Sequence, residues 1–180
     1  MNRKAIPNLL TATHMVLTVA LLLPTVPSAA FAVLYLAAGL TDMLDGWLAR
    51  RLLAESVFGA RLDSAADFFF VVVALFRLWP VAAPGTAVLL WVGAIAVLRL
   101  GAALAAKVRF GRFNFLHTCA NKYTGLLLFC YPFSLFFTRS QIVLYILCAA
   151  ATLSAAEELL VELTVKHWDP NRAGLLIKAK

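Results

Sequence analysis

Residues 42–67 read DMLDGWLARRLLAESVFGARLDSAAD, and this stretch decides how the rest of the chain is interpreted. It contains four aspartates, Asp42, Asp45, Asp63 and Asp67, in a chain that is 63% hydrophobic and has only nine acidic residues. Residues three or four apart are neighbours on a helix, so each pair of aspartates shares one helical face. We expect the two faces to meet and to form a cluster of four carboxylates.

Small residues accompany both pairs of aspartates. Gly46 and Ala49 continue the stripe of the first pair, and Gly59 precedes the second pair by four residues. Four uncompensated carboxylates at the edge of a membrane would repel one another and would be costly to desolvate. Hard divalent cations remove this problem, because Mg²⁺ and Mn²⁺ favour carboxylate oxygens and Mg²⁺ is usually completed by water and substrate phosphates. We therefore expect two Mg²⁺ or Mn²⁺ ions and a diphosphate substrate.

The spacing of the stretch resembles the signature of the CDP-alcohol phosphotransferases at all eight specified positions. The signature residues are Asp42-x-x-Asp45-Gly46-x-x-Ala49-Arg50 and, after eight further residues, Gly59-x-x-x-Asp63-x-x-x-Asp67. The resemblance implies a transferase of phospholipid synthesis that moves the phosphatidyl group from CDP-diacylglycerol to a small alcohol and releases CMP. It also implies a homodimer.

The same resemblance implies roles for individual residues. The four aspartates would bind the metal ions, and Asp67 would also be the general base that takes the proton of the acceptor hydroxyl. The remaining signature residues would contact the CDP diphosphate: Gly46, Ala49, Arg50 and Gly59.

Composition indicates a membrane protein. The chain has 180 residues and a mean hydropathy of +0.88, which fits a single integral membrane domain, residues 1–180, without a separate soluble domain. The net charge of +7 would indicate a nucleic-acid partner in a polar protein. Here the basic residues lie between apolar runs, where they set topology and attract anionic membrane lipids, so we expect no nucleic-acid partner.

The apolar runs predict an all-α, polytopic membrane protein with six transmembrane helices, because each run has roughly the 20 residues that cross a bilayer core. A juxtamembrane segment, about 1–7, would precede them, and a polar tail, about 166–180, would follow. The expected helices run to Leu23, from Ser28 to about Arg51, from Glu55 or Ser56 to Leu78, from Thr86 to about Ala106, from about Phe115 to Phe137, and from Gln141 to about Thr164. We expect a break at Trp79-Pro80 and a kink at Pro132.

Basic residues are distributed unevenly about these six helices. Only Arg77 and Arg139 fall near one side of the membrane. Thirteen fall on or near the other side: Arg3, Lys4, Arg50, Arg51, Arg61, Lys107, Arg109, Arg112, Lys122, Lys166, Arg172, Lys178 and Lys180. This positive-inside bias predicts that both termini and the signature face the cytoplasm from the plasma or inner membrane.

Arg99 is the exception to this distribution, since it falls well inside the expected fourth helix. An arginine there needs a partner or a polar cavity, although its side chain could also snorkel to the surface. Arg109, Arg112, His117 and Lys122 follow it in the chain. Together these residues would form a pocket for an anionic acceptor or a lipid phosphate, or else a simple charge cluster at the cytoplasmic surface.

Polar residues on the first helix bear on the identity of the acceptor. Asn8, Thr11 and His14 fall on one stripe, and such a stripe in a membrane helix faces protein or a cavity, so Asn8 and Thr11 join the candidate acceptor or phosphate pocket. Residues Pro7–Thr11 are similar to the opening of the family branch that makes phosphatidylglycerol phosphate, which has an arginine at the position of His14. The similarity of Pro7–Thr11 to this branch implies glycerol 3-phosphate as the acceptor. Residues Leu62–Asp67 are closer to the phosphatidylserine branch, so serine, inositol and inositol phosphate stay as alternatives.

Two other classes of protein place acidic residues within membrane helices. An intramembrane prenyltransferase uses paired DxxD motifs with Mg²⁺ and a diphosphate, but its motifs stand in well-separated helices and lack the Gly-x-x-Ala-Arg element. A cation transporter could hold four carboxylates, but it would have no need for Arg50 and the glycines in this register. Glu157, Glu158 and Glu162 are expected at the solvated end of the sixth helix.

Overall fold

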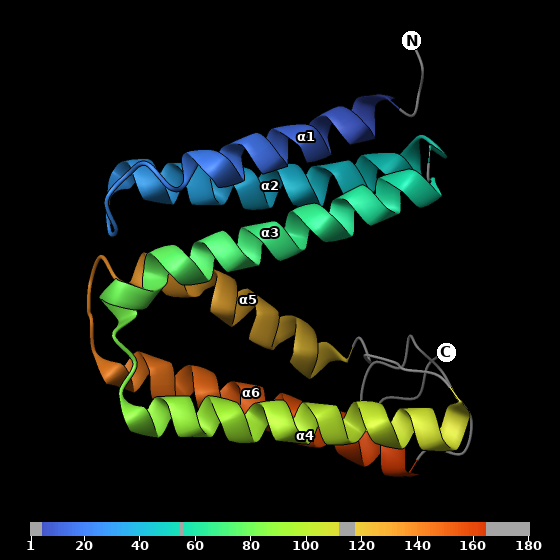
Figure 1. Ribbon diagram of the computed structural model, residues 1–180, viewed down its shortest axis with the longest axis vertical. Helices are drawn as coiled ribbons and strands as arrows, with labels where there is room; N and C mark the ends of the chain where they lie inside the picture. The colour runs from blue at the N-terminus through green and yellow to red at the C-terminus, as the bar shows by residue number, and fades with distance from the viewer. Residues whose placement is uncertain (1–4, 55, 112–117, 165–180) are drawn as a thin grey trace. The chain divides into compact units, whose positions relative to one another are not determined.

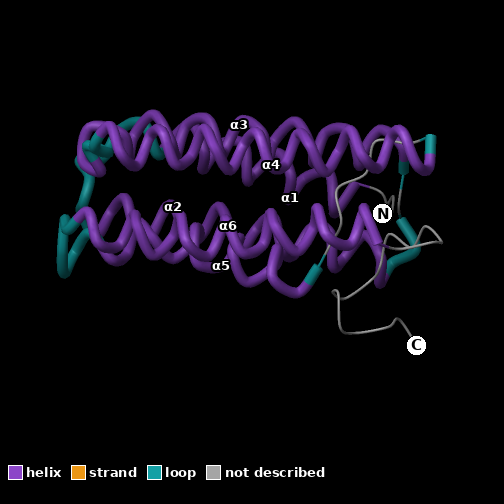
Figure 2. Tube along the Cα trace, turned by 90° about the horizontal axis from the view of Figure 1, so that it is seen from below, coloured by secondary structure: helices purple, strands orange, loops and turns teal. Residues whose placement is uncertain are grey.

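The computed structural model describes residues 5–54, 56–111 and 118–164. Within these ranges the regular elements are all α-helices and no strand occurs (Figure 2). The six helices are α1 (Ala5–Ala20), α2 (Ala29–Arg51), α3 (Val57–Ala82), α4 (Thr86–Phe110), α5 (Cys119–Ser134) and α6 (Gln141–Thr164). The all-α prediction is confirmed, and α6 has the predicted bounds.

Side-chain caps explain where three of the helices begin. The Ser28 hydroxyl accepts the Phe31 N–H at 3.1 Å, and the Ser56 hydroxyl accepts the Gly59 N–H at 3.0 Å. A side-chain oxygen at this position satisfies a backbone donor that the first turn leaves unpaired. Thr118 accepts the Asn121 N–H at 3.2 Å in the same way, and α5 begins at Cys119; the expected start near Phe115 lies outside the described residues.

Helix α3 continues through Trp79-Pro80, where the sequence predicted a break. Proline removes one helical hydrogen bond, and because Pro80 stands in the last turn the helix loses little before it ends. Ala83 then adopts a left-handed conformation with φ +38°, and its N–H donates to the Trp79 carbonyl at 2.9 Å. The predicted break was therefore wrong, since the helix stops at this C-cap and not at the proline.

Helices α1, α2 and α3 form one compact unit (Figure 1). Helix α1 packs against both α2 and α3, which carry the two halves of the signature. Aromatic rings connect the three helices, because the ring centroid of Phe70 on α3 lies 5.1 Å from that of Tyr35 on α2 and 5.3 Å from that of His14 on α1. Helix α1 thus joins the two halves of the signature.

Helices α4, α5 and α6 form a second compact unit, in which α6 packs against both α4 and α5. Its buried cluster includes Val88 and Ile95 of α4 with Cys148 and Ala155 of α6. Small residues at a helix contact let the backbones approach closely, which is how helices in a membrane gain packing energy.

Four helices, α2, α3, α4 and α6, are long and apolar enough to cross a membrane. Only 22–28% of the residues in their apolar windows are buried within the protein, so most apolar side chains lie outward, as expected for helices in lipid. Helices α1 and α5 have 16 residues each. At 1.5 Å per residue each is about 24 Å long, against a hydrocarbon core of about 30 Å. The chain is an integral membrane protein, and helix length supports four of the six predicted spans.

Candidate active site

The carboxylates of Asp42, Asp63 and Asp67 come together between α2 and α3. One oxygen atom of each lies within 4.8 Å of the corresponding atoms of the other two. Asp42 and Asp63 are partly buried, whereas Asp67 is exposed. Three carboxylates at this separation offer only hard, anionic oxygens, and this donor set fits Mg²⁺ or Mn²⁺. The predicted meeting of the two helical faces is confirmed for these three residues.

Asp45 stands apart from this three-carboxylate group. Its carboxylate accepts a hydrogen bond of 2.7 Å from the Thr11 hydroxyl of α1, and only 3% of its surface is exposed. The Thr11 hydroxyl also lies 3.1 Å from the Pro7 carbonyl, and Thr11 is itself buried. A charged acceptor makes the stronger hydrogen bond, so Thr11 fixes the orientation of Asp45.

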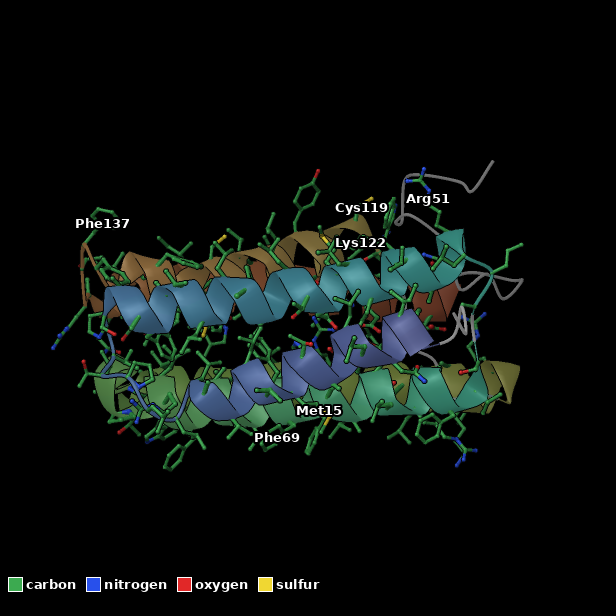
Figure 3. The ribbon with its side chains drawn as sticks, turned by 90° about the horizontal axis from the view of Figure 1, so that it is seen from above. Met15, Arg51, Phe69, Cys119, Lys122 and Phe137 are labelled. Carbon is green, nitrogen blue, oxygen red and sulfur yellow. The ribbon has the colours of Figure 1, made fainter. Side chains whose placement is uncertain are left out.

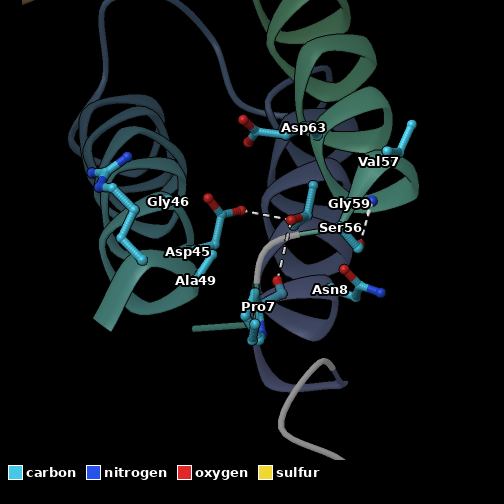
Figure 4. A pocket seen from close by; sticks show the side chains of 13 residues that line it. Pro7, Asn8, Asp45, Gly46, Ala49, Ser56, Val57, Gly59 and Asp63 are labelled. Atoms are coloured by element: carbon cyan, nitrogen blue, oxygen red, sulfur yellow. Dashed lines mark hydrogen bonds between the residues drawn. The ribbon is translucent and has the colours of Figure 1, made fainter. Parts of the chain in front are cut away.

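A cavity of about 550 Å³ lies beside the carboxylates within the α1–α3 unit. Figure 4 shows side chains from all three helices around it. Its lining residues are Pro7, Asn8 and Thr11 of α1, Asp45, Gly46, Ala49 and Arg50 of α2, Ala54 and Ser56 of the connection, and Val57, Gly59, Ala60 and Asp63 of α3. Six of the eight signature residues are among them.

The two signature glycines keep space for polar side chains at this cavity. A Cβ atom on Gly46 would lie 3.6 Å from the Arg50 guanidinium, which folds back over the glycine. A Cβ atom on Gly59 would lie 3.0 Å from the Ser56 hydroxyl oxygen and 3.2 Å from the Asn8 amide oxygen. Gly59 therefore lets Ser56 and Asn8 approach α3 more closely than most Cβ contacts would allow.

Part of the predicted acceptor pocket coincides with this cavity, because Asn8 and Thr11 line it together with signature residues. The sequence did not point to Ala54, Val57 or Ala60, whose small or apolar side chains carry no chemical signal. Ser56 was recognised only as a helix start, yet it both caps α3 and lines the cavity.

Arg99, Arg109 and Lys122 belong to the second unit. The guanidinium of Arg99 forms an ion pair of 2.9 Å with Glu158 of α6. It also donates to the Asn121 amide oxygen at 3.1 Å and the Ser154 hydroxyl at 3.4 Å. The expectation that this arginine finds a polar partner inside the protein is confirmed.

The other basic candidates differ in their surroundings. Arg109 donates to the main-chain carbonyl of Glu162. Lys122 is exposed on α5, and Arg51 is exposed at the end of α2 (Figure 3). Arg112 and His117 lie outside the described residues, as do the N-terminal residues 1–4 and the tail from residue 165.

The predicted solvent exposure of the α6 glutamates was wrong for two of them. Glu158 and Glu162 were expected at a solvated helix end, but each is only 3% exposed. Ser154, Glu158 and Glu162 recur every four residues, which puts them on one helical face. That spacing predicts a polar stripe, and a polar stripe in a membrane helix faces protein or a cavity, as it does for Asn8, Thr11 and His14 of α1.

Comparison with known proteins agrees with this geometry. No solved structure matches the chain significantly. The sequence model of a family described as CDP-alcohol phosphatidyltransferase matches residues 4–165, which takes in α1 to α6 of both units. Since this match covers most of the 180 residues, the chain belongs to the CDP-alcohol phosphatidyltransferase family of phosphotransferases, which transfer substituted phosphate groups.

Proposed function

We propose that the protein transfers the phosphatidyl group of CDP-diacylglycerol to glycerol 3-phosphate and releases CMP. The observation that carries this proposal is the cavity of about 550 Å³, which brings six signature residues together beside a group of three carboxylates. Its polar lining from Asn8, Ser56 and Arg50 offers hydrogen-bond donors and acceptors for a nucleotide and a positive charge for its phosphates. A prenyltransferase or a cation transporter would leave Arg50 and the glycine positions without a purpose.

Asp42, Asp63 and Asp67 are the residues that would hold divalent cations, with Asp45 adding a carboxylate oriented by Thr11. Two bound Mg²⁺ or Mn²⁺ ions would offset the charge of the diphosphate and of the departing CMP. Gly46 and Ala49 lack bulky side chains, so the diphosphate can lie close to α2. Arg50, which folds back over Gly46, would pair with a phosphate oxygen.

Asp67 is the proposed general base. Its side chain is exposed, so an acceptor hydroxyl can reach it, whereas Asp45 is buried. The acceptor oxygen would form a bond to the phosphorus of the lipid phosphate as the bond between that phosphorus and the CMP oxygen breaks. The hydroxyl proton would pass to the Asp67 carboxylate, which requires hydrogen-bonding distance to the hydroxyl.

Glycerol 3-phosphate is an anionic acceptor, and this choice is supported by the similarity of the Pro7–Thr11 segment to the family branch that makes phosphatidylglycerol phosphate. The test is to incubate purified protein with Mn²⁺, CDP-diacylglycerol and, in separate reactions, glycerol 3-phosphate, serine, inositol and inositol phosphate. We expect CMP release in the reaction that contains glycerol 3-phosphate and in none of the reactions with the other three acceptors. Release with another acceptor would correct the acceptor, and a different CDP-alcohol would be tested in the same way. No CMP from any donor and acceptor would refute the enzymatic proposal.

The proposal also places the active site at the cytoplasmic face, with six spans and both termini in the cytoplasm. The strong bias of basic residues supports this orientation. Helices α1 and α5 would cross where the bilayer is locally thinner or the flanking residues reach the interface, at a modest energetic cost. We further propose a homodimer, as the family resemblance implies, and its mass in detergent can be measured by light scattering.

A further inference from the structure

His14 of α1 has one ring nitrogen that is satisfied and one that is not. The residue is buried, with 1% of its surface exposed, and Nδ1 lies 2.8 Å from the main-chain carbonyl oxygen of Ala38 on α2. A carbonyl only accepts, so Nδ1 carries a hydrogen and donates it. The second nitrogen, Nε2, is buried and has no hydrogen-bond partner among the residues that the structure describes. A buried polar atom in this state is unfavourable unless a ligand or a water meets it.

The contacts of His14 place its ring about one helical turn from the group formed by Asp42, Asp63 and Asp67. Ala38 precedes Asp42 by four residues on α2, and Phe70, whose ring is 5.3 Å from that of His14, follows Asp67 by three residues on α3. Each separation is about one helical turn of 3.6 residues. The imidazole therefore lies one turn below both Asp42 and Asp67, on the side away from the connection between α2 and α3.

The register of α1 agrees with this placement. Thr11 contacts Asp45, and His14 comes one turn later along the antiparallel helix. The ring is also near enough to Asp42, Asp45 and Asp63 to interact with them electrostatically. Helix α1 thus contacts the fourth carboxylate through Thr11 and carries His14 one turn away from the level of the other three.

We propose that Nε2 of His14 forms a hydrogen bond with an O–H group that enters the space among the carboxylates of Asp42, Asp63 and Asp67. His14 is thereby a positioning residue for the reaction. Water and hydroxyl groups can both donate to and accept from a ring nitrogen, so either would satisfy Nε2. The O–H group has two chemical sources: a water molecule on a bound divalent cation, or the hydroxyl of the acceptor alcohol. Direct coordination of Mg²⁺ by this nitrogen is not expected, because hard cations favour oxygen. The inference rests on the proposed function.

Two substitutions separate the two nitrogens of the ring. In His14→Asn, the side-chain amide stands where Nδ1 stood and can still donate to Ala38, but nothing polar reaches the Nε2 position. In His14→Gln, the longer side chain carries an amide to the Nε2 position, and this amide can donate or accept. Loss of a group that orients a metal ligand typically lowers metal affinity or activity about 10–100-fold.

The first measurement is Mn²⁺ binding to the full-length protein in detergent without substrates, followed by electron paramagnetic resonance. If the O–H group is a water on the cation, His14→Asn weakens Mn²⁺ binding about 10–100-fold, His14→Gln recovers much of it, and the melting temperature of His14→Asn stays near that of the wild type. If the O–H group is the acceptor hydroxyl, Mn²⁺ binding stays unchanged while kcat falls or the acceptor KM rises in His14→Asn, again with recovery in His14→Gln.

Wild-type values for Mn²⁺ affinity, kcat and acceptor KM in a folded His14→Asn protein would overturn the inference. If His14→Asn does not fold, His14→Gln and His14→Met make the comparison, because they are matched in length and only glutamine is polar at the Nε2 position. Equal Mn²⁺ affinity and kinetics in that pair would also overturn it. The proposed function is tested independently of this inference. Wild-type protein that binds Mn²⁺ but releases no CMP from any donor would refute the activity, and the comparison of Mn²⁺ affinities would still decide the role of His14.

Discussion

The four signature aspartates are equivalent in spacing but not in surroundings. Asp67 is exposed, Asp42 and Asp63 are partly buried, and Asp45 is almost wholly buried against Thr11. A carboxylate that must receive a proton from a diffusing alcohol has to be reachable, and Asp67 meets that condition best. The buried hydrogen bond to Thr11 suits Asp45 to a fixed role in binding.

Replacing Asp67 by asparagine should abolish transfer but preserve much of the metal-dependent binding of the CDP-lipid. The amide keeps the shape and one oxygen but cannot accept the proton, and loss of a general base typically lowers the rate by ~10² to 10⁴. Asp42→Asn should weaken Mn²⁺ and CDP-lipid binding together, because a charged ligand is removed. Titration calorimetry and CMP release, at matched melting temperatures, make this comparison. An equal loss of binding in both variants would mean that Asp67 is mainly a metal ligand.

At the scale of single elements, the start of α3 serves two purposes. Ser56 caps the helix through the Gly59 N–H, and the same turn forms a wall of the cavity with Asn8 packed against it. The close approach depends on the absence of a Cβ atom at position 59.

Gly59→Ala should therefore weaken CDP-lipid binding and lower the melting temperature. The new Cβ would lie 3.0 Å from the Ser56 hydroxyl oxygen and 3.2 Å from the Asn8 amide oxygen, so both must move. A shift large enough to break the Ser56 cap would cost about 1 kcal/mol. Gly101→Ala on α4 is the matched control, because nothing lies within 4 Å of its Cβ position and alanine favours a helix. Wild-type CDP-lipid affinity in Gly59→Ala would contradict the proposed role of this turn.

The buried charge pair between α4 and α6 makes a second prediction at this scale. Glu158 is 3% exposed and the Arg99 side chain 28% exposed, so the pair is partly shielded from solvent. Arg99→Met should destabilise the protein by about 3 kcal/mol, because it removes the cation that offsets the Glu158 carboxylate.

The double variant Arg99→Met with Glu158→Gln should recover much of that loss, since no charge then needs compensation. Arg139→Met, at an exposed position in the loop before α6, controls for the loss of one positive charge. Thermal unfolding in detergent is the measurement. If Arg99→Met unfolds at the temperature of Arg139→Met, the ion pair contributes little to stability.

For the whole molecule, the family match covers helices of both units, whereas the signature and its cavity lie within the first. The second unit holds the charged residues of α4 and α6. Orientation in the membrane is a property of the entire chain, because it depends on how basic residues are divided between the two faces.

Labelling of single cysteines tests the six-span orientation, in a background where Cys119, Cys130 and Cys148 are replaced. Cysteines at Lys4, Ser56, Arg112 and Lys178 should react from the cytoplasmic side. Cysteines at Thr25, Ala83 and Ser140 should react from the opposite side, because the basic residues that hold the chain in the cytoplasm lie on the other face. Labelling at position 112 from outside the cell would contradict the six-span arrangement.

Features that depend on spacing along one helix could be predicted from the sequence. The Asp42–Asp45 and Asp63–Asp67 pairs, the starts of α2 near Ser28 and of α3 near Ser56, and the bounds of α6 all follow from local geometry, which each segment carries with it. The spacing of Ser154, Glu158 and Glu162 is an equally local feature and indicates their shared buried face.

Which helical faces meet could not be predicted in this way, because it depends on how the helices pack in three dimensions. The contacts of Thr11 with Asp45, His14 with Ala38 and Arg99 with Glu158 join residues 34, 24 and 59 positions apart. Such contacts depend on the rotation and the register of one helix against another, and a rotation of a few tens of degrees would bring different side chains together. For this reason the four carboxylates, which are equivalent in the sequence, divide in the fold into a group of three and one that is hydrogen-bonded to α1.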